Sequence, residues 1–111
     1  KLNHEEAVKI ACKAAAQLMD AGLKVFCPIA HSHHIREKGG VELPLTHEFW
    51  LGQDKPFVDA ASMLIVVMMK GWSESKGVAW EIDEFAQAGK PILYWPWKDD
   101  EDIRELTDEL I

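Results

Sequence analysis

The chain has 111 residues, a formal net charge of −7 and 48% hydrophobic residues. This length suits one domain over residues 1–111, and the acidic balance argues against a nucleic-acid surface, which needs concentrated Lys and Arg. The longest apolar run, Met63–Met69, is too short to cross a membrane. We therefore expect neither nucleic acid nor a membrane as a partner.

The two cysteines, Cys12 and Cys27, fall within apolar patterns and form no recognisable disulfide framework. The first residues, Lys1–Glu6, are polar and do not resemble a signal peptide. These features predict a reduced, cytoplasmic setting in which both thiols are small core residues.

The first part of the chain predicts a helix, a strand and a long loop. Asn3 and Glu6 form a capping-box pattern, and apolar residues then recur at helical spacing until Gly22. Leu23–Cys27 has the pattern of a short strand that ends at a proline. No period holds over Ile29–Leu45, which predicts a long, histidine-rich loop of the kind that is usually functional or disordered.

The second part continues the alternation of helices and strands. The apolar run Met63–Met69 is typical of a strand buried on both faces of a parallel sheet. The other predicted elements are a short helix at Thr46–Leu51, a helix from Asp54 to Ala61, a helix at Gly77–Gly89, a strand at Pro91–Trp95 and a closing helix over 99–111.

Strands that alternate with helices, without hairpin turns, imply right-handed crossovers in a parallel sheet. We therefore predict an α/β domain with a three-layer, flavodoxin-like or Rossmann-like architecture. Ligands of such sheets bind outside the carboxyl ends of the strands. Here those ends are Cys27–Pro28, Met69–Lys70 and Trp95–Pro96, so the histidine-rich loop and the segment "KGWSESKG" are expected at one edge.

Glu81 stands out on the predicted helix at Gly77–Gly89. On a helical wheel it lies beside Phe85, at the margin of an apolar stripe, while Asp83, Glu84 and Gln87 face away. A partly exposed glutamate stabilised by the helix dipole is one interpretation. A nucleophilic carboxylate is the other, and it needs a second acid/base group and donors that hold a substrate. Asp54 and Ser75 are the candidates that the sequence offers.

The joint pattern "PIAHSHHI", Trp50 four residues before Asp54, "GWSESKGVAWE" and "GKP" resembles the nucleoside 2-deoxyribosyltransferase superfamily. It is most similar to a branch of small bacterial and phage proteins of unknown function, with the pattern P-ahsH-I, W---D and GW--S-G---E. The resemblance extends from Asn3 to Trp95.

The resemblance implies a role for individual residues. Glu81 matches the family nucleophile, which attacks the anomeric carbon of the sugar, and Asp54 matches the aspartate near the leaving base. Ser75 matches a position that helps to hold the phosphate of a nucleoside monophosphate. His33, Trp72 and Gly77 complete the implied substrate contacts, and no cofactor or metal is implied. The resemblance also implies a homo-oligomer with sites near the subunit interfaces.

Two departures from the superfamily bear on this interpretation. Superfamily members begin with a strand before the first helix, and that strand is missing from this chain, so we expect a gap between Leu23–Cys27 and Met63–Met69. Asp83 also occupies a position where the enzymes usually keep a small residue.

Other side chains leave alternatives open. The histidines His31, His33 and His34 could bind a metal, but without a cysteine pair or a helical pair of histidines, hydrogen bonding to a ligand is the favoured role. Trp72 either packs against its own loop or covers a base or sugar, and Trp80 is predicted to be exposed and to mark a subunit interface.

Two functions therefore remain. The first is an enzyme that cleaves or exchanges the N-glycosidic bond of a nucleoside or nucleoside 5′-monophosphate. The second is a non-catalytic binder or sensor of a nucleotide derivative that uses the same pocket.

Overall fold

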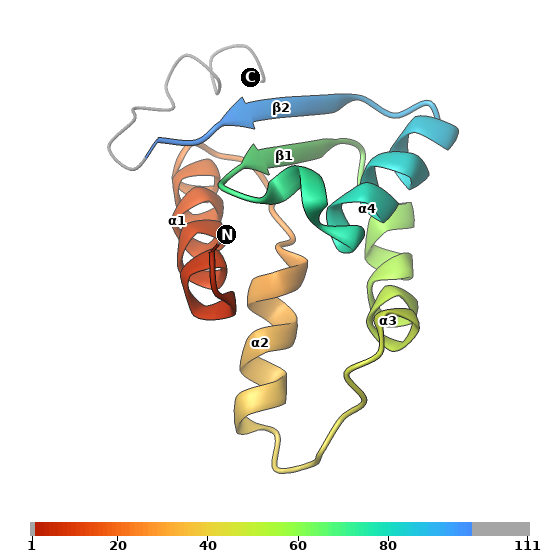
Figure 1. Ribbon diagram of the computed structural model, residues 1–111. Helices are drawn as coiled ribbons and strands as arrows, with labels where there is room; N and C mark the ends of the chain where they lie inside the picture. Colours follow the sequence, from red (N-terminus) through yellow and green to blue (C-terminus); the bar gives the residue numbers. More distant parts are fainter. Residues whose placement is uncertain (1, 99–111) are drawn as a thin grey trace.

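The computed structural model describes residues 2–98, which form a mixed α/β arrangement with a small parallel sheet (Figure 1). Along the chain its elements are α1 (His4–Asp20), α2 (Pro28–Lys38), α3 (His47–Ala60), β1 (Leu64–Met68), the 3-10 helix η1 (Trp72–Glu74), α4 (Lys76–Gln87) and β2 (Ile92–Pro96). No helix in this part of the chain is long and apolar enough to cross a membrane. The helix predicted over 99–111 lies outside the described residues.

Helix α1 begins and ends as predicted. The side chain of Asn3 accepts a hydrogen bond from the backbone N–H of Glu6 at 2.8 Å, and the Glu6 carboxylate accepts one from the N–H of Asn3 at 3.2 Å. Gly22 follows the helix with a φ of 104°, a conformation that favours glycine. Cys12 is exposed rather than buried, so its prediction as a core residue was wrong. The buried face of α1 consists of Ala11, Ala14, Ala15 and Leu18.

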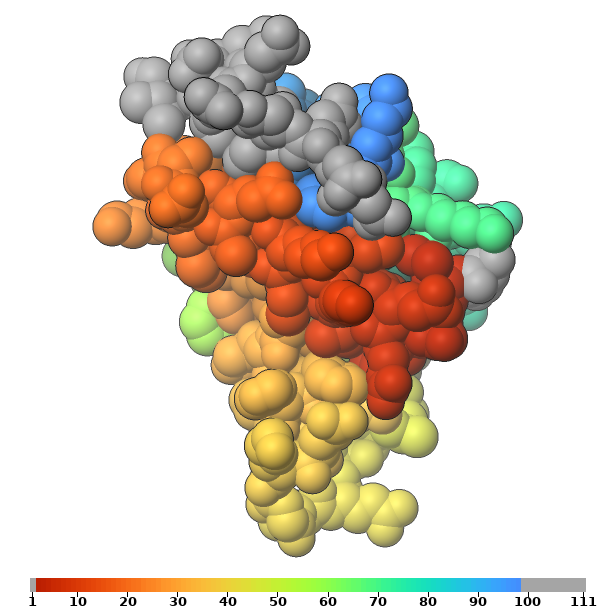
Figure 2. Space-filling view, turned by 90° about the vertical axis from the view of Figure 1, so that its left-hand side faces the viewer, coloured from red at the N-terminus to blue at the C-terminus, as the bar shows by residue number. Residues whose placement is uncertain are grey.

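Helix α2 replaces most of the predicted loop over Ile29–Leu45. Pro28 stands in the first turn, where its fixed φ suits a helix and its missing N–H costs no hydrogen bond. None of the residues of α2 is buried, which explains why the sequence shows no apolar period there. The connection from α2 to α3 protrudes at one end of the molecule and exposes Val41 and Leu45 (Figure 2).

Helix α3 joins two helices that were predicted separately, at Thr46–Leu51 and Asp54–Ala61. It is continuous from His47 to Ala60 with Pro56 inside. A proline within a helix removes one backbone hydrogen bond and usually kinks or ends it. Here Val58 is 7% exposed, so contacts of the following turn with the protein interior favour the continued helix.

Strands β1 and β2 run parallel, as predicted, with Leu64 opposite Ile92 and Met68 opposite Pro96. Ile65 and Val67 pack against a cluster formed by Ala14, Leu18 and Trp95 (the buried core of the α1 side). Val66 points to the opposite face of the strand and is only 3% exposed. Both faces of β1 are therefore covered, which accounts for its unbroken apolar sequence.

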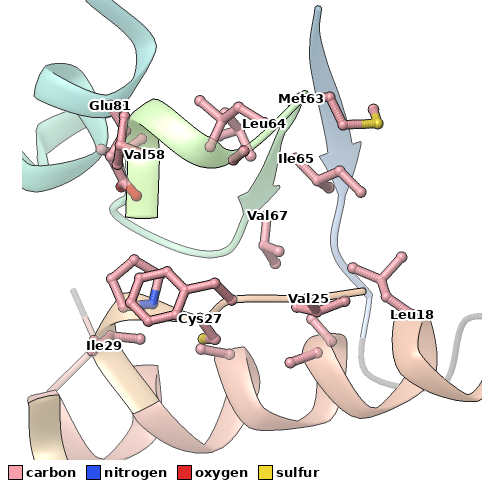
Figure 3. Close-up of a pocket in the computed structure, with 18 of the residues that line it drawn as sticks. Leu18, Val25, Cys27, Ile29, Val58, Met63, Leu64, Ile65, Val67 and Glu81 are labelled. Carbon is pink, nitrogen blue, oxygen red and sulfur yellow. The ribbon is translucent and has the colours of Figure 1, made fainter. Parts of the chain in front are cut away.

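Residues 23–27 are extended but form no strand, so that prediction was wrong for the described part of the chain. The sheet there has two strands only, and a strand requires a neighbouring backbone to pair with. The expected gap is present as an apolar cavity of about 260 Å³ between this segment and β1 (Figure 3). Val67 and Val25 lie on its two sides, and Glu81 lies at one end.

Candidate functional site

A cavity of about 380 Å³ opens where β1 ends. Its walls come from the beginnings of α1 and α2, from α3, from the segment after β1 and from α4. Five of the six residues that the sequence singled out line this one cavity: Asp54, Trp72, Ser75, Gly77 and Glu81. A concave surface therefore lies at the carboxyl end of β1, where the sequence analysis predicts a ligand site.

Glu81 is carried by α4, whose apolar face holds Phe85 in the protein interior at 3% exposure. The side chain of Glu81 is partly buried, and it lines both the site cavity and the apolar cavity beside β1. Burial, and to a smaller extent the nearby negative charge of Asp54, together raise its pKa from the usual 4.5 to about 7. Glu81 is thus a titrating carboxyl at neutral pH rather than a permanently charged surface group.

Asp54 reaches the same cavity from α3. The sequence did not determine at which edge of the sheet this residue lies, and the structure places it on the side of Glu81. Partial burial raises the pKa of Asp54, and the positive charge of His31 acts in the opposite direction. Two carboxyl groups with raised pKa values in one cavity are an arrangement typical of functional sites.

Ser75 begins α4 as its N-cap. Its hydroxyl oxygen accepts a hydrogen bond from the N–H of Val78 at 3.2 Å. The hydroxyl proton remains available to a ligand in the cavity. A side chain at Gly77 would meet the hydroxyl oxygen of Ser75 at 3.8 Å, an ordinary contact, so Gly77 lines the cavity without an evident need for glycine.

Trp72 stands in η1 just after Gly71, whose φ of 85° turns the chain away from β1. Its ring lies 5.9 Å from that of Tyr94, in a tilted arrangement, and it also lines the cavity. The ring therefore packs against β2 and also lines the cavity, and its contact with a base or sugar stays a prediction.

His33 is absent from this cavity, so its prediction as a ligand contact at the site is not supported. Its Nδ1 lies 3.0 Å from Nε2 of His4, and its Nε2 lies 3.4 Å from a carboxylate oxygen of Glu37. His4, His33 and Glu37 line a separate pocket. The cause is the helix that replaced the predicted loop: successive side chains of α2 point about 100° apart, and Ser32 rather than His33 faces the site.

Sequence reasoning missed several residues of the cavity. Trp80 was predicted to be exposed, but it is only partly exposed and lines the cavity. Outside the cavity, Glu84 was predicted to face water, but its carboxylate forms an ion pair with Lys55 of α3 at 2.8 Å. This second error arises because α3 packs against α4, a contact that no local pattern reveals. Lys70 could have been found, since it directly follows the carboxyl end of the strand.

No group of three His, Cys, Asp or Glu side chains within residues 2–98 is arranged to hold a metal ion. The polar groups that line the cavity include two carboxyl groups, hydroxyl groups and one lysine. This set suits an organic ligand with polar groups and an apolar part.

Comparison with known proteins gives one family. No curated protein matches the chain. The family model of a domain of unknown function, DUF1937, matches residues 2–97, which include every residue of the candidate site. The chain therefore belongs to the DUF1937 family.

Proposed function

We propose that this domain cleaves or exchanges the N-glycosidic bond of a nucleoside or nucleoside 5′-monophosphate. The observation that carries the proposal is the pair of carboxyl groups, Glu81 and Asp54, in one cavity beyond the end of β1. Two carboxyl groups that differ in environment are the usual means of breaking a glycosidic bond, one as nucleophile and one as acid and base.

The reaction follows from these two groups. The Glu81 carboxylate attacks the anomeric carbon, the bond from that carbon to the base nitrogen breaks, and the base leaves with a proton supplied by Asp54. The ester between the sugar and Glu81 is then attacked by water or by a second base, whose proton passes to Asp54. The pair must hold one proton in total, and it must lie on Asp54 when Glu81 reacts.

The charge of the substrate favours that distribution. In the ligand-free protein, burial keeps the pKa of Glu81 at about 7. Positive charge that develops on the sugar ring beside Glu81 stabilises its ionised form, and a proton on Asp54 removes the repulsion between the two groups. In the free protein the proton therefore lies on Glu81, and substrate binding favours its transfer to Asp54.

The remaining walls of the cavity support a nucleoside as the ligand. Trp72 and Trp80 offer apolar aromatic surface for a base or sugar. Lys70 and the Ser75 hydroxyl at the start of α4 are suited to an anionic group such as a 5′-phosphate. A cavity of about 380 Å³ falls within the range of small-molecule sites.

We infer in addition that the domain is related to the nucleoside 2-deoxyribosyltransferase superfamily and shares its three-layer, flavodoxin-like arrangement. The support is the motif pattern, the parallel pairing of β1 and β2, and the burial of both faces of β1. The same motifs connect Glu81, Asp54 and Ser75 with the chemistry proposed above.

The proton on Glu81 gives a second candidate function. A carboxyl group with a pKa of about 7 is half protonated in neutral solution, and a neutral carboxyl group donates and accepts hydrogen bonds without attacking carbon. Such a site would bind or sense a nucleotide derivative without turnover.

One experiment separates the two functions. Ribonucleosides, deoxyribonucleosides and their 5′-monophosphates are incubated with the protein, with and without a second free base, and released base is followed by chromatography. Calorimetry measures binding of the same compounds. We expect release from at least one compound. Binding of a nucleotide with no release would support the binder, and neither release nor binding would contradict both functions. Glu81→Gln protein purified in parallel controls for a contaminating nucleosidase.

Ser75 allows its structural role to be separated from its proposed ligand contact. Ser75→Ala removes the cap of α4 and is expected to lower the free energy of unfolding by about 1 kcal/mol. Ser75→Asp keeps an acceptor for the Val78 N–H but adds a negative charge. We expect Ser75→Asp to retain stability in urea unfolding.

The same Ser75→Asp variant tests the phosphate contact. Binding of 5′-monophosphates should weaken at least about tenfold more than binding of the corresponding nucleosides, because like charges then meet in the cavity. Equal effects on both ligand classes would show that Ser75 acts only as the cap of α4.

A further inference from the structure

Lys55 of α3 joins the two helices that carry the carboxyl groups of the candidate site. Its Nζ lies 2.8 Å from a carboxylate oxygen of Glu84 on α4. The same Nζ donates a hydrogen bond to the carboxylate of Asp59, one turn further along α3, at 2.9 Å. Among the ion pairs of residues 2–98, the pair with Glu84 is the one that connects α3 to α4. It is not a fully solvated surface contact, because the side chain of Glu84 is only 20% exposed.

This ion pair lies next to the pair of carboxyl groups in the cavity. Lys55 directly follows Asp54 in α3. Glu84 follows Glu81 by three residues, so these two side chains are neighbours on one side of α4. Two pairs of ionisable groups are therefore shared between the same turns of the two helices. Lys55 and Glu84 attract each other, whereas the two carboxyl groups of the cavity repel each other whenever both are ionised.

A second lysine anchors the end of α3 but not the part that carries Asp54. Lys90, which follows α4, donates hydrogen bonds from its Nζ to the backbone carbonyl oxygens of Val58 and Asp59, at 3.4 and 2.7 Å. These contacts hold the last turn of α3. Asp54 stands about one turn earlier, where the space between the helices opens into the cavity. At that level, the ion pair described above opposes the repulsion between the two carboxyl groups.

We propose that Lys55 is a positioning residue of the candidate site: its ion pair with Glu84 holds α3 against α4, so that Asp54 and Glu81 line one cavity despite their repulsion. Lys55 is not among the residues that line the cavity, so it acts through the position of Asp54 and not on a ligand. The consequence for base release rests on the proposed function. The effect on the two carboxyl groups does not, because they share the cavity of the ligand-free protein.

The test measures how strongly Asp54 acts on Glu81 in the ligand-free protein. Carbon NMR follows the titration of the Glu81 carboxyl group, with and without Asp54→Asn. In the wild-type background this substitution should lower the pKa of Glu81 by about half a pH unit, because it removes a nearby negative charge. In the Lys55→Met background the effect of Asp54→Asn should fall to less than about half of that value, because the two carboxyl groups can then move apart.

A charge swap separates the ion pair from the charge at position 55. Lys55→Glu alone should weaken the effect of Asp54→Asn, as Lys55→Met does. Lys55→Glu combined with Glu84→Lys keeps the ion pair with its charges exchanged and should restore the effect. The direct influence of a changed charge on Glu81 is present with and without Asp54→Asn, so it cancels in each comparison.

Asp59→Asn is the matched control, since it removes the other partner of Lys55 and leaves the ion pair with Glu84 in place. It should leave the effect of Asp54→Asn unchanged. An undiminished effect in Lys55→Met would overturn the proposal. A charge swap that leaves the effect weak would also overturn it, because Lys55 would then act by some means other than the ion pair. None of these readouts requires turnover, so they stand apart from the assay of base release.

Discussion

Glu81→Gln is expected to lower the rate of base release by more than about a thousandfold. Glutamine keeps the size of the side chain and its hydrogen bonds, but its amide cannot form the ester with the sugar. The measurement is kcat/KM for the best substrate of the panel. Asp83→Asn is the matched control, because Asp83 is exposed on the same helix and accepts a hydrogen bond from Gln87 at the solvent-facing surface. It should retain activity within about threefold.

The pH dependence of the wild-type protein tests the same assignment. The reactive form holds one proton on the pair, on Asp54 while Glu81 is ionised, and the pair loses its last proton at the pKa of Glu81, about 7. Above that value kcat/KM should fall tenfold per pH unit, and so by about fiftyfold between pH 7 and pH 9. Asp54→Asn removes the negative charge that raises the pKa of Glu81. Residual activity in this variant depends on ionised Glu81 alone, so it should instead rise with pH through the lowered pKa of Glu81.

A wild-type rate that keeps rising as the pH rises above 7 would contradict this mechanism, because the pair would then react without its proton. Asp54 would not be the proton donor in that case. Activity that survives in Glu81→Gln at the wild-type level would remove Glu81 from the chemistry altogether.

The second large effect of Glu81→Gln is on stability, which this substitution is expected to raise. The pKa of Glu81 in the folded protein, about 7, lies above its ordinary value of 4.5. Below pH 4.5 the carboxyl is neutral in both states and costs nothing. Between these values the unfolded chain loses the proton while the folded chain keeps it, so the folded state loses stability as the pH rises. Above about 7 the full cost, on the order of 3 kcal/mol, is present.

Glu81→Gln removes this cost because an amide does not titrate. In urea unfolding, the free energy of unfolding of the variant should exceed that of the wild type by about 3 kcal/mol more at pH 8 than at pH 4.5. Asp83→Asn should show no such growing difference. If the free energies of unfolding of Glu81→Gln and the wild type differed by a constant amount across this pH range, the pKa of Glu81 would not be raised in the folded protein.

The same side chain is therefore expected to weaken the fold and to supply the activity. Burial of an ionisable group is costly, and a protein that keeps one in a cavity beside a second carboxyl group commonly uses it. Loss of activity together with a gain of stability in Glu81→Gln would be hard to explain by a purely structural role.

The sequence alone predicted the elements whose local pattern and tertiary role agree. The capping box at Asn3 and Glu6 set the start of α1, and the apolar run Met63–Met69 identified β1 because both of its faces are covered. The helix predicted from Gly77 is α4, which begins one residue earlier, at Lys76. Short-range hydrogen bonds and burial of a whole segment depend on the types of consecutive residues, so they can be predicted from the sequence.

Only the tertiary structure decided the rest. Helix α2 buries no residue and so has no apolar period, and its turn directs His33 to His4 and away from the site. Residues 23–27 form no strand because, among residues 2–98, none pairs with them there. The approach of Asp54 to Glu81 depends on the packing of α3 against α4. Contacts between segments that are distant in the chain cannot be predicted from the residue pattern of either segment. The candidate site is formed by residues that such contacts bring together.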